Sequence, residues 1–187
     1  MWIALRGCFH FPFTLPFGTL QRLEYAGEIV GASQKAQLKI QGRSSMLQYG
    51  ETYDEVHKRF QWRIPEYYNI GIDVCDKHAL TRPNSLAILY YRGEGDPIRY
   101  TFGQLRTLSN RLANVFVAKG LKQGDRVGIL LPQAPETAIA HIAAYKAGLI
   151  AVPLFTLFGQ DALAYRLSSS GAKILITGED SLEKLAG

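Results

Sequence analysis

Apolar residues recur at helical spacing between Thr101 and Gly120. They lie three or four positions apart, at Phe102, Leu105, Leu108, Leu112, Val115 and Phe116. This spacing places them on one face of a helix. Thr101 and Gln104 match the capping-box pattern, and Gly120 supplies a residue that readily ends a helix in the left-handed conformation. The pattern predicts an amphipathic helix with a buried apolar face and with Arg106 and Arg111 in solvent.

Three short apolar runs farther along the chain predict buried strands. Residues 126–131, 149–154 and 173–177 are bounded by turn residues or proline, as is typical of strands covered on both faces. Helical patterns separate these runs, one over residues 135–148 and one over residues 161–170. Strands and helices that alternate with short connections predict a parallel sheet.

Two smaller elements precede this alternation. Residues 86–92 and 97–100 predict strands joined by a turn at 93–96, and hence a β-hairpin. A short amphipathic helix is predicted over residues 66–80, with Cys75 on its buried face; a reactive thiol is the alternative.

These elements predict an α/β fold, an incomplete doubly wound and mostly parallel sheet with flanking helices and one β-hairpin. The last predicted strand, 173–177, comes close to the end of the chain. We therefore expect some strands of the sheet to lie outside this chain, so that an edge and some apolar surface stay exposed.

The first 45 residues follow neither the helical nor the strand pattern of apolar positions. Phe9, Phe11 and Phe13 alternate around Pro12, and this proline also interrupts the apolar run that a secretory signal needs. We predict that residues 1–45 are a leader, either disordered or upstream of a natural start at Met46. A mitochondrial transit peptide is the alternative, since the segment is basic.

Charge and cysteine content narrow the function classes. Of the net charge of +5, +3 lies before Met46, and the remaining basic residues are scattered singly. That distribution lacks the basic stripe of a nucleic-acid-binding protein. Cys8 and Cys75 form no metal-binding or disulfide pattern, which favours a reducing compartment and the cytoplasm by default. No apolar run approaches the roughly 20 residues of a transmembrane helix.

A search for catalytic motifs gives no site. The sequence contains no dinucleotide fingerprint, P-loop or nucleophile elbow. His10, His57, His78 and His141 share no metal-binding spacing, and structural or exposed positions are the simpler interpretation. The run Ser168–Gly171 could cradle a phosphate, but it follows a helix, so a helix end is favoured.

Three segments carry a resemblance to a known family. They read YDEVHKRFQWRIPEYYNIGIDVCDKHA (53–79), RYTFGQLRTLSNRLANVFVAKGLKQGDRVGILLPQAPE (99–136) and AAYKAGLIAVPLFTLFGQDALAYRLSSSGAKILIT (143–177). Their order resembles the beginning of AMP-forming acyl-CoA synthetases, within the adenylate-forming superfamily, and the medium-chain branch is the most similar. Residues 46–187 would then form the N-terminal part of the AMP-dependent ligase domain.

The resemblance implies a full-length enzyme that uses ATP, Mg²⁺ and coenzyme A. It converts a small carboxylic acid into an acyl-adenylate and then transfers the acyl group to the coenzyme A thiol. The family's phosphate-binding loop and catalytic lysine have no counterpart in this sequence, so the resemblance assigns no catalytic or metal-binding residue here. We expect the chain alone to be inactive and to bind none of these cofactors tightly.

One site is implied by the same resemblance. In related synthetases the loop at Phe155, Thr156 and Leu157 borders the coenzyme A site. This sequence departs from those relatives, which have small glycines at Thr156 and Leu157. Packing residues are the alternative for this loop, and a non-catalytic α/β module that binds a partner is the alternative for the whole chain.

Overall fold

The computed structural model describes residues 2–5, 49–62 and 65–185. The chain divides into two compact units, one formed by Met1–Gln21 with Asn69–Gly187 and the other by Arg22–Tyr68. The predicted boundary at Met46 lies outside the described residues, so the division into a leader of 1–45 and a domain of 46–187 stays a prediction.

The unit Arg22–Tyr68 contains one described helix, α2 (Tyr53–Arg59), which the sequence analysis did not predict. The Thr52 hydroxyl accepts a hydrogen bond from the Glu55 backbone N–H at 3.3 Å. This is half of a capping box, and the pair Thr52 and Glu55 was a usable sequence signal. No residue of α2 is buried.

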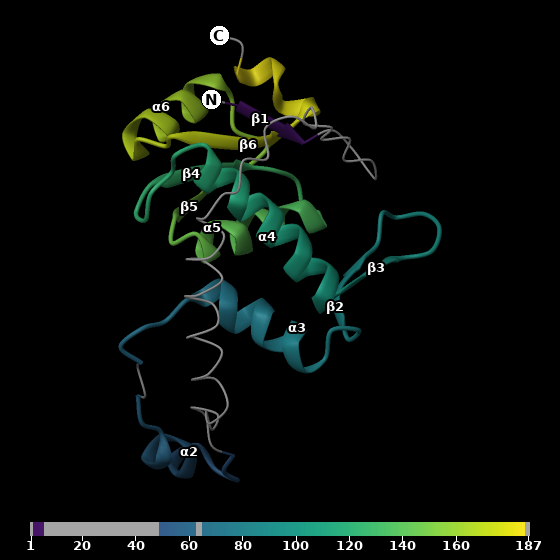
Figure 1. Cartoon of the computed structure of the whole chain (residues 1–187), viewed down its shortest axis with the longest axis vertical. Coiled ribbons are helices and arrows are strands. Elements are labelled where there is room, and N and C mark those ends of the chain that lie inside the picture. Colours follow the sequence, from purple (N-terminus) through teal and green to yellow (C-terminus); the bar gives the residue numbers. More distant parts are fainter. Residues whose placement is uncertain (1, 6–48, 63–64, 186–187) are drawn as a thin grey trace. The chain divides into compact units, whose positions relative to one another are not determined.

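The other unit is built on a parallel sheet, and each of the three predicted strands is confirmed. They are β4 (Arg126–Leu130), β5 (Ile150–Pro153) and β6 (Ile174–Gly178). The strand order is β1-β6-β4-β5, so β6 lies between β4 and β1 (Figure 1). The sheet therefore has β5 at one edge and β1 at the other.

Strand β1 (Trp2–Leu5) was not predicted. It runs parallel to β6, with Trp2 opposite Leu175 and Leu5 opposite Gly178. Its four residues, WIAL, are all apolar and therefore show no alternation of apolar and polar positions. The outer side of β6 is thus covered by Trp2–Leu5, whereas the sequence analysis expected an edge of the sheet to stay exposed.

Helices cover both faces of the sheet, as the predicted doubly wound fold requires. Helices α4 (Phe102–Ala118) and α5 (Pro135–Lys146) lie on one face, and α6 (Gln160–Ser170) lies on the other (Figure 1). Alternate strand residues divide between the faces. The first core includes Phe116, Val127, Ile129, Ala140, Ala143, Ile174 and Ile176. The second includes Leu130, Leu154, Leu163 and Leu175.

The predicted helix ends are confirmed. The Thr101 hydroxyl accepts from the Gln104 N–H at 3.3 Å, and the Gln104 side chain accepts from the Thr101 N–H at 2.8 Å. Gly171 ends α6 in the left-handed conformation at φ +62°. Residues 168–171 therefore form a helix end, which was the favoured interpretation of this run.

The predicted hairpin is also confirmed, with β2 (Leu86–Tyr90) antiparallel to β3 (Ile98–Thr101). The helix predicted over 66–80 is confirmed in type but begins later, at Ile70. After Ile70 and Gly71 comes the π-helical segment η1 (Ile72–Asp76), and α3 (Lys77–Thr81) follows. The start is late because the Asn69 side-chain oxygen accepts from the Ile72 N–H at 3.1 Å, which makes Asn69 the capping residue.

After β6 the chain makes two short turns, η2 (Glu179–Ser181) and η3 (Glu183–Leu185). Leu185 packs against the α6 core. Among the described residues, no helix is long and apolar enough to cross a membrane.

Candidate functional site

The carboxyl ends of β4, β5 and β6 meet at one edge of the sheet because the three strands are parallel. Ligands of doubly wound proteins bind outside this edge. The predicted site residues Phe155, Thr156 and Leu157 lie there, directly after β5 and the buried Leu154. The structure thus places the predicted loop where the fold rule requires a site.

The loop 155–158 is a tight turn that presents apolar side chains. The Phe158 N–H donates to the Phe155 carbonyl at 3.0 Å, and the two rings meet edge to face with centroids 6.0 Å apart. Phe155 is 58% exposed and Leu157 is 79% exposed. These two side chains are therefore available for contact with a ligand or with another part of a protein.

Two cationic side chains hold the turn. The Lys184 ammonium donates to the Thr156 carbonyl at 2.6 Å. The Arg166 guanidinium lies 4.5 Å from the centroid of the Phe158 ring. Segments far apart in the sequence thus fix the backbone of the loop, while the outer surface of Leu157 stays in solvent.

The loop after β4 leads into α5 and is tied by backbone contacts. The Thr137 hydroxyl donates to the Pro132 carbonyl at 2.6 Å. His141 Nδ1 lies 2.8 Å from the Thr137 carbonyl, so this nitrogen carries the proton and donates. His141 therefore bonds within its own helix, in agreement with the structural interpretation.

His78, like His141, bonds to a neighbour in its own segment. Its Nδ1 accepts from the Arg82 guanidinium at 3.0 Å, and its ring lies 4.9 Å from that of Phe102. Burial, assisted by the positive charges of Arg82 and Lys77, lowers the pKa of His78 below its ordinary value. His78 is therefore neutral with its Nδ1 already hydrogen-bonded, which agrees with the structural interpretation of this residue.

Lys146 and Asp76 form a buried ion pair that the sequence analysis missed. Lys146 Nζ lies 2.5 Å from Asp76 Oδ1, and the two side chains are 6% and 5% exposed. The ammonium also donates to Ser109 Oγ at 2.9 Å and to Asn110 Oδ1 at 2.8 Å. Lys146 Nζ thus has two hydrogen-bond acceptors and one carboxylate as neighbours, which compensates the burial of its charge.

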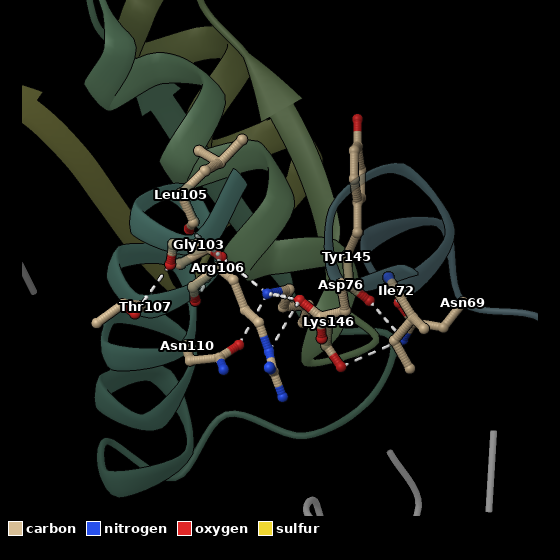
Figure 2. A network of polar contacts seen from close by, with 11 residues as sticks. Asn69, Ile72, Asp76, Gly103, Leu105, Arg106, Thr107, Asn110, Tyr145 and Lys146 are labelled. Atoms are coloured by element: carbon tan, nitrogen blue, oxygen red, sulfur yellow. Dashed lines mark hydrogen bonds and ion pairs between the residues drawn. The ribbon is translucent and has the colours of Figure 1, made fainter. Parts of the chain in front are cut away.

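This ion pair is the centre of a polar network that joins three helices (Figure 2). Asp76 comes from η1, Ser109 and Asn110 from α4, and Lys146 from the last turn of α5. The Asn69 amide adds a tie to α5, because it donates to the Tyr145 carbonyl at 2.9 Å. The network fixes the 70–81 helix against the helices that cover the sheet.

Arg106 corrects one expectation. Its side chain was predicted to lie in solvent, but it is only 34% exposed and its Nε lies 3.9 Å from Asp76 Oδ1 (Figure 2). The buried carboxylate attracts the guanidinium to the rim of the network. The helical pattern gave the correct face for the apolar residues but no information on a charge from a distant segment.

Cys75 confirms the predicted burial, since its side chain is fully buried beside this network. Burial raises the pKa of the Cys75 thiol, and the nearby Lys146 ammonium opposes that rise. A raised pKa disfavours the thiolate, which is the nucleophilic form. The structure therefore supports a packing role for Cys75 and not a reactive thiol.

The described residues hold no group of three or more His, Cys, Asp or Glu side chains that could bind a metal ion.

Comparison with known proteins decides the family. The sequence model of the AMP-binding enzyme family matches residues 75–187, a range that includes the three predicted strands and the loop at 155–157. The chain belongs to this family. The mitochondrial acyl-coenzyme A synthetase ACSM3 of Mus musculus is 34% identical over 143 residues, covering 73% of this chain. The acetyl-coenzyme A synthetase of Bacillus subtilis is 34% identical over 161 residues, covering 81% of this chain.

Solved structures of this family agree with the fold. An acyl-CoA synthetase of Brucella canis superposes on 64% of this chain with a TM-score of 0.60 and 35% identity. The N-terminal domain of FACL13 from Mycobacterium tuberculosis covers 64% of this chain with a TM-score of 0.58 and 32% identity. The predicted fold class and the predicted family are both confirmed.

This member of the AMP-binding family spans about a quarter of the length of its relatives. It covers 25% of the mouse protein and 27% of the Bacillus protein. It also covers 22% of the Brucella chain and 29% of the FACL13 domain.

Proposed function

We propose that this chain forms the front part of an AMP-forming acyl-CoA synthetase. In the proposed reaction a carboxylate oxygen attacks the α-phosphorus of ATP and releases pyrophosphate. The coenzyme A sulfur then attacks the acyl carbon, and AMP leaves. The observation that carries the proposal is the family match over residues 75–187, which contains the parallel strands and the loop at their carboxyl edge.

In this proposal the chain is a scaffold and lacks the catalytic centre. Adenylation builds negative charge on the phosphates, and enzymes stabilise such charge with positioned donors, lysines and metal ions. The buried lysine of the described unit, Lys146, is already neutralised by Asp76. We therefore expect no adenylation by this chain alone and no tight binding of ATP or coenzyme A.

The proposed role of Phe155, Thr156 and Leu157 is to border the coenzyme A arm. Their support is positional and chemical: the loop lies at the carboxyl edge, Phe155 and Leu157 are exposed, and Lys184 holds the Thr156 carbonyl. An apolar rim of this kind suits the aliphatic part of an extended ligand. A small carboxylic acid is the proposed substrate of the whole enzyme.

A chimeric enzyme tests the proposal. Residues 69–185 of this chain replace the corresponding segment of the Bacillus subtilis acetyl-coenzyme A synthetase, and ATP–pyrophosphate exchange is measured with a panel of carboxylic acids. We expect exchange by the chimera and none by the 187-residue chain. A folded chimera without exchange on any acid would contradict the synthetase proposal and favour the non-catalytic partner-binding module.

The same chimera tests the coenzyme A loop separately. We expect Leu157→Ser to raise the KM for coenzyme A severalfold while pyrophosphate exchange, which precedes the thiol step, is unchanged. The matched control is Tyr165→Ser on α6, which is also exposed, at 72%. If the two substitutions changed the KM for coenzyme A equally, the loop would not border the coenzyme A site.

We propose a cytoplasmic location, with the mitochondrial matrix as the alternative. The mouse relative is a mitochondrial protein by name, whereas the Bacillus relative comes from a bacterium. Sequencing of the native N-terminus distinguishes a retained leader from a removed transit peptide.

A further inference from the structure

The turn after β5 contains a central peptide group that can adopt two orientations. The turn runs from Phe155 to Phe158 and is closed by the Phe158 N–H, which donates to the Phe155 carbonyl at 3.0 Å. Its central peptide joins Thr156 and Leu157. Type I and type II turns differ by a flip of this peptide, which reverses the directions of its carbonyl and its N–H. The orientation of one peptide therefore determines which polar atom the loop presents on each side.

Lys184 holds the carbonyl of this peptide. Its ammonium donates to the Thr156 carbonyl oxygen at 2.6 Å. Among residues 65–185, no carboxylate forms an ion pair with this ammonium. A hydrogen bond from a charged donor is stronger than one from a neutral donor. A flip of the peptide would break this bond, so Lys184 favours one orientation.

The segment that carries Lys184 is itself fixed to the loop. The Leu185 side chain packs against the same core as Phe158. The Gln160 side-chain amide donates to the Glu183 carbonyl at 3.5 Å, so a second hydrogen bond joins α6 to η3. Lys184 thus starts from an anchored backbone, and its ammonium can restrain the turn.

The other side of the same peptide carries the Leu157 N–H. In a planar trans peptide the N–H points opposite to the carbonyl. With the Thr156 carbonyl directed at Lys184, the Leu157 N–H therefore points away from η3. No described residue accepts a hydrogen bond from this N–H, and the Leu157 side chain is 79% exposed. The loop thus presents a backbone donor beside an apolar side chain.

We propose that Lys184 is a positioning residue of the coenzyme A step, because it holds the Thr156 carbonyl and thereby directs the Leu157 N–H toward the coenzyme A arm. This inference rests on the proposed function, which brings that arm to this loop. The arm consists of aliphatic segments joined by amides, and an apolar surface with one placed donor suits such a ligand. Lys184 acts through the Thr156–Leu157 peptide and does not touch the ligand.

Amide hydrogen exchange in the 187-residue chain, followed by NMR, tests the restraint on the turn. We expect Lys184→Met to accelerate exchange of the Phe158 amide, which closes the turn, by about fivefold, the loss of roughly one hydrogen bond. The matched control is Lys119→Met, at an exposed lysine after α4, and it should leave this rate unchanged. Equal rates at Phe158 in wild type and in both variants would overturn the restraint.

The chimera with the Bacillus subtilis synthetase tests the positioning role. We expect Lys184→Met to raise the KM for coenzyme A severalfold without a change in the KM for the carboxylic acid. Lys184→Arg, which keeps a cationic donor, should restore most of the lost affinity, and Lys119→Met should change neither KM.

Three outcomes of the chimera experiment contradict the inference in distinguishable ways. If the chimera exchanges pyrophosphate but Lys184→Met and Lys119→Met have the same KM for coenzyme A, Lys184 does not position the loop. A rise in both KM values would make Lys184 a structural residue of the whole unit and would overturn the positioning role. A folded chimera without exchange on any acid contradicts the synthetase proposal, and the inference falls with it.

Discussion

At the scale of single residues, Lys146 and Asp76 form a buried ion pair. Both side chains are buried, and they come from segments that are far apart in the sequence. Removal of one partner leaves a buried charge without compensation, which costs far more than the pair contributes relative to an apolar replacement. The ion pair therefore constrains both positions together.

We expect Lys146→Met to lower the free energy of unfolding by about 3–5 kcal/mol. The double variant Asp76→Leu, Lys146→Met should recover a large part of this loss, because no unpaired charge remains. The measurement is urea denaturation followed by circular dichroism. The control is Lys77→Met, which breaks the partly exposed Lys77–Asp73 pair at 3.5 Å and should cost about 0.5 kcal/mol or less. Equal losses for Lys146→Met and Lys77→Met would contradict this account.

Asp125 makes stability depend on pH. Its carboxylate lies 2.8 Å from Lys173 Nζ and accepts from the Lys122 N–H at 2.8 Å. The Lys173 contact and then this backbone N–H hold the pKa of Asp125 below its ordinary value of 3.8. A lowered pKa in the folded state means that the folded chain binds fewer protons than the unfolded chain near that pH.

The stabilisation from Asp125 should therefore be fully present above about pH 4 and should be lost as the pH falls through the folded-state pKa. We expect Asp125→Asn to flatten the decline in melting temperature between roughly pH 4 and pH 2. Glu94→Gln, in the exposed hairpin turn, is the control and should leave the decline unchanged. If the melting temperature of wild type and of Asp125→Asn declined equally at acid pH, the Asp125 carboxylate would not be a source of the pH dependence.

At the scale of elements, the approach of the 70–81 helix to α5 depends on Gly71. A Cβ atom at this position would lie 2.7 Å from Lys146 Cγ, 2.9 Å from the Ile142 carbonyl oxygen and 3.0 Å from the Lys146 nitrogen. Two of these neighbours are backbone atoms of α5, which cannot move without the helix. Glycine is therefore needed for close contact, and not for its conformational freedom.

We expect Gly71→Ala to destabilise the fold although alanine is the better helix former. Overpacking costs about 1–3 kcal/mol and helix propensity returns at most about 1 kcal/mol. Gly178→Ala is the control, because a Cβ there has no neighbour within 4 Å. Thermal unfolding of the two variants compares them. A more stable Gly71→Ala variant would show that α5 shifts freely.

Most elements could be predicted because their signals are local. The capping box at Thr101, the period of α4 and the apolar runs of the three strands lie within short windows of sequence. Helix α2 was missed although Thr52 and Glu55 match the capping-box pattern, so this helix could have been predicted from the sequence. Strand β1 was missed because its residues, WIAL, are all apolar and show no alternation with polar positions.

At the scale of the whole molecule, the reactivity of the Cys75 thiol measures how often the fold opens. It is fully buried next to the contact between η1, α4 and α5. Burial also raises its thiol pKa, which reduces the thiolate population near neutral pH. A thiol reagent should therefore reach Cys75 only after the unit opens.

We expect Cys75 in a Cys8→Ser chain to be labelled at least roughly a thousandfold more slowly in the native state than in urea. Lys146→Met should accelerate native labelling in proportion to its loss of stability. Labelling kinetics measured by mass spectrometry give both rates. Native labelling as fast as that of the urea-unfolded chain would place the thiol at an accessible surface.

The sequence by itself determined the α/β fold and the order of its parallel strands and helices along the chain, because period, capping and turn residues act over a few neighbours. The family followed from the resemblance of three long segments to known synthetases. Only the tertiary structure decided which distant residues meet. It paired Asp76 with Lys146, drew Arg106 to that pair, tied Thr156 to Lys184 and laid Trp2–Leu5 along β6. Such contacts depend on chain folding over long separations, and no local pattern of hydrophobic and polar residues encodes them.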